Sequence, residues 1–271
     1  MALALGLIGY GEVGQLFARE WVAGGGATVA VYDVKGDDPM QRDALARIAA
    51  EDKVQFAGSP ATAIVGADIV ISAVTADQAV AAARAAAGHL REGQVYVDLN
   101  SVAPSTKRVV AEALGGRDFV EFAVMSPVVG LGVASPILAG GPRCEYVAGR
   151  LNPLGMRIET VGYEIGVASA TKLCRSLVIK GLEAIMVDVS CAADRAGVMA
   201  GVLKSLAASY PGMDWEELVR DMPGRVARHG ARRAAEMREA SRMYEDLGGS
   251  GAFAEAIAVR HETYAAQAKR G

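Results

Sequence analysis

Residues 3–33 read LALGLIGYGEVGQLFAREWVAGGGATVAVYD and contain the clearest structural signal in the chain. It begins with an apolar run at 3–8, continues through the pattern GYGEVG at 9–14, and ends with a second apolar run at 27–32. Short continuous apolar runs are typical of strands buried on both faces of a parallel sheet, and segment 12–23 between them predicts a helix. The order of strand, glycine turn, helix and strand predicts a βαβ unit.

Gly9, Gly11 and Gly14 form a GxGxxG pattern whose position between strand and helix gives it meaning. In such a loop the first glycine permits a tight turn, the second lets the backbone approach a pyrophosphate, and the third lets helix and strand pack closely. The helix N-terminus adds free N–H groups and a positive dipole end. We therefore expect this loop to bind a dinucleotide, through the glycines and the residues between them, Tyr10, Glu12 and Val13.

An acidic residue stands where such a site needs one, because Asp33 follows the second strand about twenty positions after the glycines. Its carboxylate can accept hydrogen bonds from the ribose hydroxyls and repels a 2′-phosphate, which favours NAD over NADP. Lys35 lies two residues further on and keeps NADP open. The alternative is a plain glycine turn followed by an unrelated surface aspartate.

The pattern of short apolar runs and helical stretches continues to about residue 160. Further strands are expected at 68–74, 94–98 and 118–124, and further helices at 39–51, 76–87 and 104–114. This alternation predicts an α/β fold with a Rossmann-type doubly wound parallel sheet.

Two polar segments, Val74–Thr75 and Asn100–Ser101, follow strands of this sheet. Ligands of open α/β sheets bind at the carboxyl ends of the strands, so both segments are expected to line the cofactor site. For Thr75 and Asn100 a helix cap is an equal alternative, and the two roles are compatible.

The pattern changes in the second half of the chain. A Gly- and Pro-rich stretch at 126–143 leads to short runs at 144–148 and 157–161, after which no strand signal remains. Helices are expected at 166–197, 199–209, 213–220, 223–247 and 251–268. We therefore predict a dinucleotide-binding domain over 1–163 and an all-helical substrate and dimerisation domain over 164–271.

Composition narrows the class of protein. With 52% hydrophobic residues, 6% aromatic residues and a net charge of −3, the chain offers neither the basic field nor the stacking surface that nucleic acids require. No apolar run is long enough to span a membrane, and no signal peptide is evident. The three cysteines fall in no disulfide or zinc pattern, so we expect a cytoplasmic protein without a metal site.

The predicted helix 166–197 is apolar around most of its circumference, as buried helices are. Lys172, Ser176, Lys180 and Glu183 nevertheless fall within one narrow wedge, continued by Ser190. A buried lysine needs a partner or a shifted pKa, so the polar stripe indicates a cleft. For Lys180 and Glu183 an ordinary ion pair on a solvated seam is the alternative.

Taken together, these motifs resemble the β-hydroxyacid dehydrogenase family, the relatives of 6-phosphogluconate dehydrogenase and 3-hydroxyisobutyrate dehydrogenase. The resemblance covers the whole chain in order, through GLIGYGEVG at 6–14, VDLNSVAP at 97–104, FAVMSPVVG at 122–130 and GYEIGVASATKLCRS at 162–176. It implies an NAD(P)-dependent oxidation of a small 3-hydroxy acid or a related hydroxy compound.

The resemblance also assigns roles to residues. Lys172 corresponds to the family's catalytic lysine, Ser126 to a substrate-binding serine, and Asn100 and Ser101 lie near the nicotinamide. As general base, Lys172 takes the hydroxyl proton while hydride moves to the cofactor, and burial should lower its pKa toward roughly 7–8. The returning charge stabilises the carbonyl oxygen.

The chain departs from the family pattern around the substrate. Pro127 and Val128 replace the glycines after the serine, and Ser176, preceded by Arg175, replaces an asparagine. Arg175 and Ser176 are candidate substrate contacts. These changes bear on which substrate is bound more than on the type of reaction.

Two other functions remain open: an imine reductase-like enzyme, and a non-catalytic dinucleotide-binding sensor. Lys172 argues against both. A homodimer or larger homo-oligomer is expected, and the stripe His229, Arg232, Arg233 and Glu236 is either part of a cleft or interface or a solvated charged face.

Overall fold

The computed structural model describes residues 2–270. The chain divides into two compact units, one ending at Lys172 and the other beginning at Leu173. Within residues 2–270, none of the helices combines the length and apolar character needed to cross a membrane.

The first unit contains one eight-stranded sheet with the order β3-β2-β1-β4-β5-β6-β7-β8. Neighbouring strands pair in parallel, except that β7 runs antiparallel to β6. The strands are β1 Leu3–Ile8, β2 Ala27–Tyr32, β3 Gln55–Phe56, β4 Ile69–Ser72, β5 Val95–Asp98, β6 Asp118–Val124, β7 Pro136–Gly140 and β8 Arg157–Gly162. This topology confirms the predicted doubly wound sheet.

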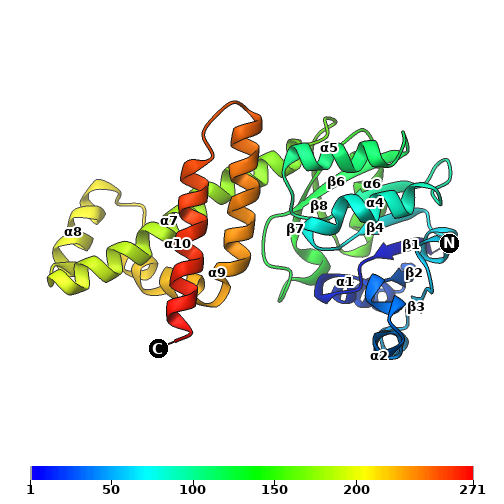
Figure 1. Cartoon of the computed structure of the whole chain (residues 1–271), viewed down its shortest axis with the longest axis horizontal. Coiled ribbons are helices and arrows are strands. Elements are labelled where there is room, and N and C mark those ends of the chain that lie inside the picture. Colours follow the sequence, from blue (N-terminus) through cyan, green and yellow to red (C-terminus); the bar gives the residue numbers. More distant parts are fainter. Residues whose placement is uncertain (1, 271) are drawn as a thin grey trace. The chain divides into compact units, whose positions relative to one another are not determined.

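Helices cover both faces of this sheet (Figure 1). They are α1 Glu12–Ala23, α2 Pro39–Glu51, α3 Pro60–Ile64, α4 Ala79–Ala87, α5 Pro104–Ala113 and α6 Cys144–Leu151, with short 3-10 turns η1 Val34–Asp37, η2 Ala76–Gln78, η3 Gly132–Ala134 and η4 Asn152–Leu154. Alternate strand residues point to opposite faces. In β4, Ile69 and Ile71 therefore join the core beneath α1, α2 and α6, while Val70 joins the core beneath α3, α4 and α5.

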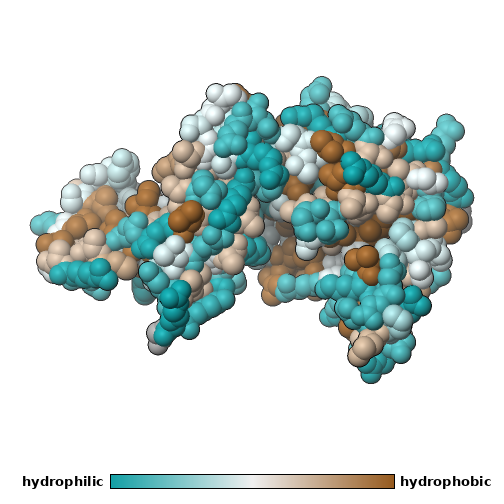
Figure 2. All heavy atoms as spheres, in the orientation of Figure 1, coloured by the Kyte–Doolittle hydropathy of each residue, from teal (hydrophilic) through white to brown (hydrophobic). Residues whose placement is uncertain are grey.

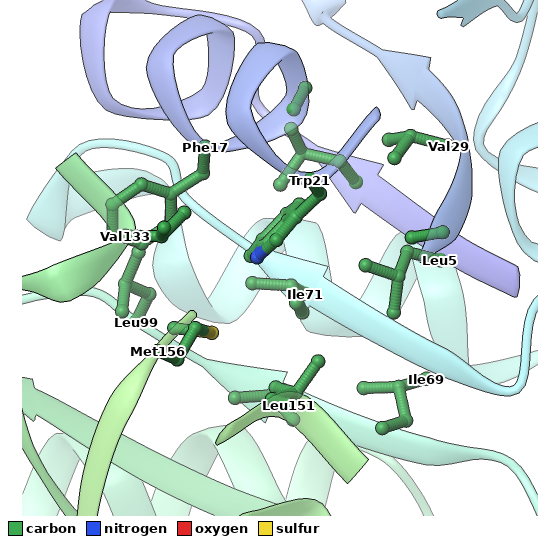
Figure 3. Packing of buried hydrophobic residues seen from close by; sticks show 14 of the residues in the cluster. Leu5, Phe17, Trp21, Val29, Ile69, Ile71, Leu99, Val133, Leu151 and Met156 are labelled. Carbon is green, nitrogen blue, oxygen red and sulfur yellow. The ribbon is translucent and has the colours of Figure 1, made fainter. Parts of the chain in front are cut away.

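The first of these cores contains the two aromatic side chains of α1. Phe17 and Trp21 stand one turn apart with ring centroids 5.4 Å apart, and both are almost fully buried. Figure 3 shows them among the aliphatic side chains of β1, β4 and the β7–β8 region. This packing fixes α1, and with it the glycine loop, against the sheet.

The observed elements differ from the expected ones where signals were short. Two strands, β3 and β7, and the five-residue α3 were not anticipated, and the run at 144–148 lies in helix α6. The reason for α6 is topological. Since β7 and β8 are parallel neighbours, the chain must cross over between them, and a helix is the usual crossover.

The second unit is entirely helical over its described residues. Its helices are α7 Val167–Ala196, whose first six residues belong to the first unit, α8 Met199–Ser209, α9 Trp215–Asp246 and α10 Ala252–Ala268. The helices α9 and α10 pack side by side in opposite directions (Figure 1). Gly230 permits their closest approach, since a Cβ there would lie 2.3 Å from the carbonyl oxygen of His261.

The prediction of separate helices at 213–220 and 223–247 was wrong, because α9 runs through Pro223 without a break. A proline inside a helix leaves the carbonyl four residues earlier without its N–H partner. That carbonyl belongs to Val219. The hydroxyl of Ser190 in α7 lies 3.5 Å from it but donates at 2.6 Å to the carbonyl oxygen of Met186. The helix continues because its buried face packs on both sides of the proline, at Met222 and Val226.

Candidate functional site

The glycine loop has the backbone geometry that its sequence predicts. Gly9 has a φ of +95°, and a Cβ there would lie 2.4 Å from the carbonyl oxygen of Ala73 on β4's continuation. A Cβ on Gly14 would lie 2.3 Å from the carbonyl oxygen of Gly9. A Cβ on Gly11 would instead meet nothing within 4 Å. Gly9 and Gly14 are therefore required by packing, while Gly11 faces open space.

That open space lies at the start of α1. Gly11 is the N-cap residue and provides no side-chain cap to the first N–H groups of the helix. Glu12 is exposed in the first turn, and Val13 packs partly against the core. Free N–H groups beside an open glycine fit the pyrophosphate of a dinucleotide.

Tyr10 ties this loop to two acidic side chains. Its backbone N–H donates to Asp33 Oδ2 at 2.8 Å, and its hydroxyl donates to Asp52 Oδ2 at 2.6 Å. Burial, reinforced by the bond to Asp52, raises the pKa of Tyr10 well above its usual range. Asp52 also pairs with Arg19 at 2.6 Å. The motif gave no signal for Asp52, which reaches the loop only through the tertiary fold.

Asp33 lies at the carboxyl end of β2, beside the glycine loop. Besides the Tyr10 N–H, its carboxylate accepts the N–H of Lys35 at 2.9 Å, and the residue is partly exposed. The carboxylate is thus held in place while part of it still faces solvent. This is the position from which an acidic residue contacts the ribose of the adenosine half.

Asn100 is buried and connects the ends of two strands. Its Oδ1 accepts the N–H of Val74 at 2.8 Å, and its Nδ2 donates to Ser72 Oγ at 3.2 Å and to Asp98. The side chain thereby fixes the two polar segments that follow β4 and β5. Asn100 is thus a clamp, in the sense that its hydrogen bonds join the ends of β4 and β5, and it is not a helix cap.

Asp98 and Lys107 were not singled out from the sequence. Both side chains are completely buried, and Lys107 Nζ donates to Asp98 Oδ2 and to the Asp98 carbonyl, each at 2.9 Å. A signal was available, because Lys107 shares the apolar face of α5 with Val110 and Leu114. A lysine on a buried face requires a buried partner.

Thr75 is exposed and occupies the N-cap position of η2. Hydrogen bonds from Gln78 and, to a smaller extent, from Thr75 lower the pKa of the Asp77 carboxyl. The threonine therefore has the backbone position of a cap, and its hydroxyl remains at the carboxyl edge of the sheet.

Lys172 and Ser101 come together from segments 71 residues apart. Lys172 lies in the second turn of α7, and its Nζ donates to Ser101 Oγ at 2.5 Å. Ser101 follows the Asn100 clamp at the carboxyl end of β5. The structure thus places the lysine amine at the sheet edge where ligands of such folds bind.

Ser126 lies in the loop after β6. Its Oγ is buried, and none of the described residues offers it a hydrogen-bond partner. The loop that follows is anchored at its far end, where the N–H of Val133 donates to Glu20 at 2.8 Å. An unsatisfied buried hydroxyl in an anchored loop is a candidate ligand contact.

Arg175 and Ser176 belong to the second unit. Arg175 is exposed, whereas Ser176 is buried and its Oγ accepts a hydrogen bond from Lys180 Nζ at 3.0 Å. Lys180 also pairs with Glu236 of α9 at 2.7 Å.

The remaining charges of the polar stripe pair between helices. Glu183 binds Arg233 of α9, so the alternative of a Lys180–Glu183 pair was wrong. His229 is exposed overall. Its pKa is lowered, first by partial loss of water around the ring and then by the charges of Arg232 and Arg233. The segment HGARRAAEM of α9 therefore joins this helix to α7 through two ion pairs.

Comparisons with known proteins agree with this architecture. The model of the NAD binding domain of 6-phosphogluconate dehydrogenase matches residues 4–148, and the DUF1932 model matches residues 193–264. A conserved protein from Sinorhizobium meliloti 1021 is 38% identical, with a TM-score of 0.88 over 98% of this chain and 89% of its own. Conserved protein MTH1747, described as structurally similar to 3-hydroxyacid dehydrogenases, is 30% identical, with a TM-score of 0.81 over 98% and 99%.

More distant structures share the fold alone. The 3-hydroxyisobutyrate dehydrogenase of Mycobacterium tuberculosis is 19% identical, with a TM-score of 0.80 over 98% of this chain and 94% of its own. An imine reductase from Streptomyces aurantiacus is 18% identical, with a TM-score of 0.60 over 96% and 93%. The family match covers more than half of the chain and includes the glycine loop. The chain belongs to the family of NAD-binding dehydrogenases defined by the NAD binding domain of 6-phosphogluconate dehydrogenase.

Proposed function

We propose that the protein is an NAD-dependent dehydrogenase that oxidises the CH–OH group of a small 3-hydroxy acid or a related hydroxy compound. The contact between Lys172 and Ser101 carries this proposal. It supplies an amine, held at the carboxyl edge of a nucleotide-binding sheet, where a general base for an alcohol is needed. A sensor that only binds the cofactor needs no such group.

Lys172 acts as the base that receives the hydroxyl proton of the substrate. Ser101 holds the amine in place, and the protonated lysine then stabilises the developing carbonyl oxygen. The nicotinamide, when bound, accepts the hydride. An imine reductase has no hydroxyl proton to remove, so the lysine favours the alcohol substrate.

Ser126 is the proposed contact for the acid group of the substrate, since its buried hydroxyl lacks a partner among the described residues. Pro127 has no backbone N–H, so this loop offers one donor fewer than a glycine-containing loop does. Arg175 and Ser176 are proposed as additional substrate contacts, and Asn100 as the clamp that positions Ser101 near the nicotinamide.

Asp33 supports NAD as the preferred cofactor, because its carboxylate is fixed beside the glycine loop and repels a 2′-phosphate. Lys35 directs its backbone N–H to that carboxylate.

Incubation of the purified protein with NAD or NADP and a panel of 3-hydroxy acids, 3-hydroxy amino acids and aryl analogues tests the proposal. Reduction of the nicotinamide, followed at 340 nm, is expected with at least one compound. Absence of turnover across the panel, together with reduction of cyclic imines by NADPH, would contradict it.

A further inference from the structure

Two buried acidic side chains stand next to each other in the sheet of the first unit. Asp98 of β5 and Glu121 of β6 are register partners, and both are completely buried. A buried carboxylate is costly unless it is paired or accepts several hydrogen bonds. The Asp98 carboxylate binds Asn100, which precedes Ser101 in the chain. The Glu121 carboxylate binds the start of α7, the helix that carries Lys172.

Asp98 supports the serine. Lys107 neutralises its Oδ2, while its Oδ1 accepts hydrogen bonds from the side chain of Asn100 and, at 3.4 Å, from the Asn100 N–H. Ser101 is the next residue in the chain. Hydrogen bonds to Asp98 therefore hold the backbone next to Ser101 in place.

Glu121 supports the lysine. Its Oε1 accepts the N–H groups of Gly166 at 2.7 Å and Ala168 at 2.9 Å, and its Oε2 accepts the Ser169 hydroxyl at 2.8 Å and the Ser169 N–H at 3.4 Å. These donors lie at the start of α7, where helix N–H groups lack intrahelical partners and a negative charge complements the dipole. One carboxylate thus accepts three backbone N–H groups and a hydroxyl at the start of the helix.

The Glu121 carboxylate occupies space that a side chain at Gly140 would need. Gly140 is its register partner on β7, and a Cβ at Gly140 would lie 2.8 Å from Glu121 Oε1. Gly166 has a φ of +108°, which turns the chain into the helix. The Glu121 carboxylate and the glycines beside it therefore shape the junction between the sheet and the start of α7.

We propose that Glu121 is a positioning residue for Lys172: it fixes the first turn of α7 on the sheet and so sets the contact of the lysine with Ser101. Ser169, which Glu121 binds twice, precedes Lys172 by three positions, and residues at that spacing are neighbours on a helix surface. Misplacement of a reacting group by about 1 Å can cost about a hundredfold in rate. The inference rests on the proposed role of Lys172 as base.

Glu121→Gln tests this role with little change in shape. The amide retains one acceptor oxygen but brings an NH2 group toward backbone N–H donors and removes the charge at the helix start. We expect kcat to fall by about 10–100-fold with the KM for NAD within twofold of the parent value, and faster amide exchange at residues 166–169. Asp118→Asn is the matched control, because it makes the same change at the half-exposed end of β6 and should leave kcat unchanged.

Two milder variants distinguish a positioning role from a folding defect. Ser169→Ala removes one donor to the carboxylate and should lower kcat less than Glu121→Gln does, while Glu121→Asp retains the charge and should restore part of the loss. Unchanged kcat in folded, NAD-binding Glu121→Gln would overturn the proposal.

A second measurement does not depend on turnover. In protein labelled with 13C-lysine, the Lys172 side-chain resonance of Glu121→Gln should lie at a different chemical shift from that of the parent protein, because the contact of the lysine with Ser101 is altered. An identical chemical shift in the two proteins would overturn the positioning role. If the parent protein turns over no substrate, the proposed function fails while this chemical shift still decides the role of Glu121.

Discussion

At the scale of single residues, two glycines of the loop have different roles: packing requires Gly14, whereas Gly11 is expected to contact the ligand. Gly14 has no room for a side chain, whereas Gly11 faces open space at the start of α1. Gly14→Ala should therefore lower the free energy of unfolding by about 1–3 kcal/mol through overpacking. Gly11→Ala should keep the melting temperature but weaken NAD binding at least tenfold, because its methyl group occupies the pyrophosphate space. Calorimetry of unfolding and of NAD binding checks both, and full NAD affinity in Gly11→Ala would show that this space is not used.

Asp33 offers a second test at this scale. Asp33→Asn removes the charge that repels a 2′-phosphate but keeps an acceptor for the Tyr10 N–H. The affinity for NADP relative to NAD should rise about tenfold, equivalent to about 1.4 kcal/mol. Titration of both cofactors by calorimetry measures the ratio, with Asp43→Asn on the exposed face of α2 as control. An unaltered ratio would refute the role given to this carboxylate.

At the scale of elements, the Lys107–Asp98 pair joins α5 to the end of β5. Removing one partner of a buried ion pair leaves an unpaired charge and typically costs 3–5 kcal/mol. Lys107→Met should therefore lower the free energy of unfolding by about that amount in urea titrations. The double variant with Asp98→Asn should recover part of the loss, and exposed Lys269→Met should show none. A loss below about 1 kcal/mol for Lys107→Met would mean that the pair is not a structural support.

Element prediction succeeded where a continuous apolar run marked a buried strand and failed where tertiary neighbours decided. The strands at 3–8, 27–32 and 118–124 were predicted to the residue. The β7–α6 segment was not, because a short antiparallel strand and a crossover helix follow from the neighbours they pair with. In α9, Pro223 indicated a helix end, but tertiary packing of Met222 and Val226 keeps the helix continuous.

The candidate site divides in the same way. The glycines, Asp33 and Lys172 carry local motifs and could be found from the sequence. Asp52 and Glu121 act through hydrogen bonds to segments far away in the chain, so no local motif identifies them. Lys107 could have been found from its place on the apolar face of α5. Glu121 in particular appears in the sequence as one polar residue inside an apolar strand.

At the scale of the whole molecule, we propose that the second unit mediates self-association. Among its described residues, α8 has no buried side chain, and Val198, Tyr210 and Met213 around it are exposed. Figure 2 shows apolar surface over this helix. Light scattering after size exclusion should give a dimer or larger oligomer, and Val198→Glu, at an exposed position beside α8, should shift it toward the monomer. A monomer at all concentrations would contradict this proposal.

The proposed role of Lys172 as the base of a dehydrogenase can be tested by a single substitution. Lys172→Ala is assayed for NAD reduction with the best substrate of the panel, and its affinity for NAD is measured in parallel. We predict a loss of turnover of at least a hundredfold, in the range of general acid–base catalysis, with NAD affinity retained. Turnover equal to that of the parent protein would contradict the account.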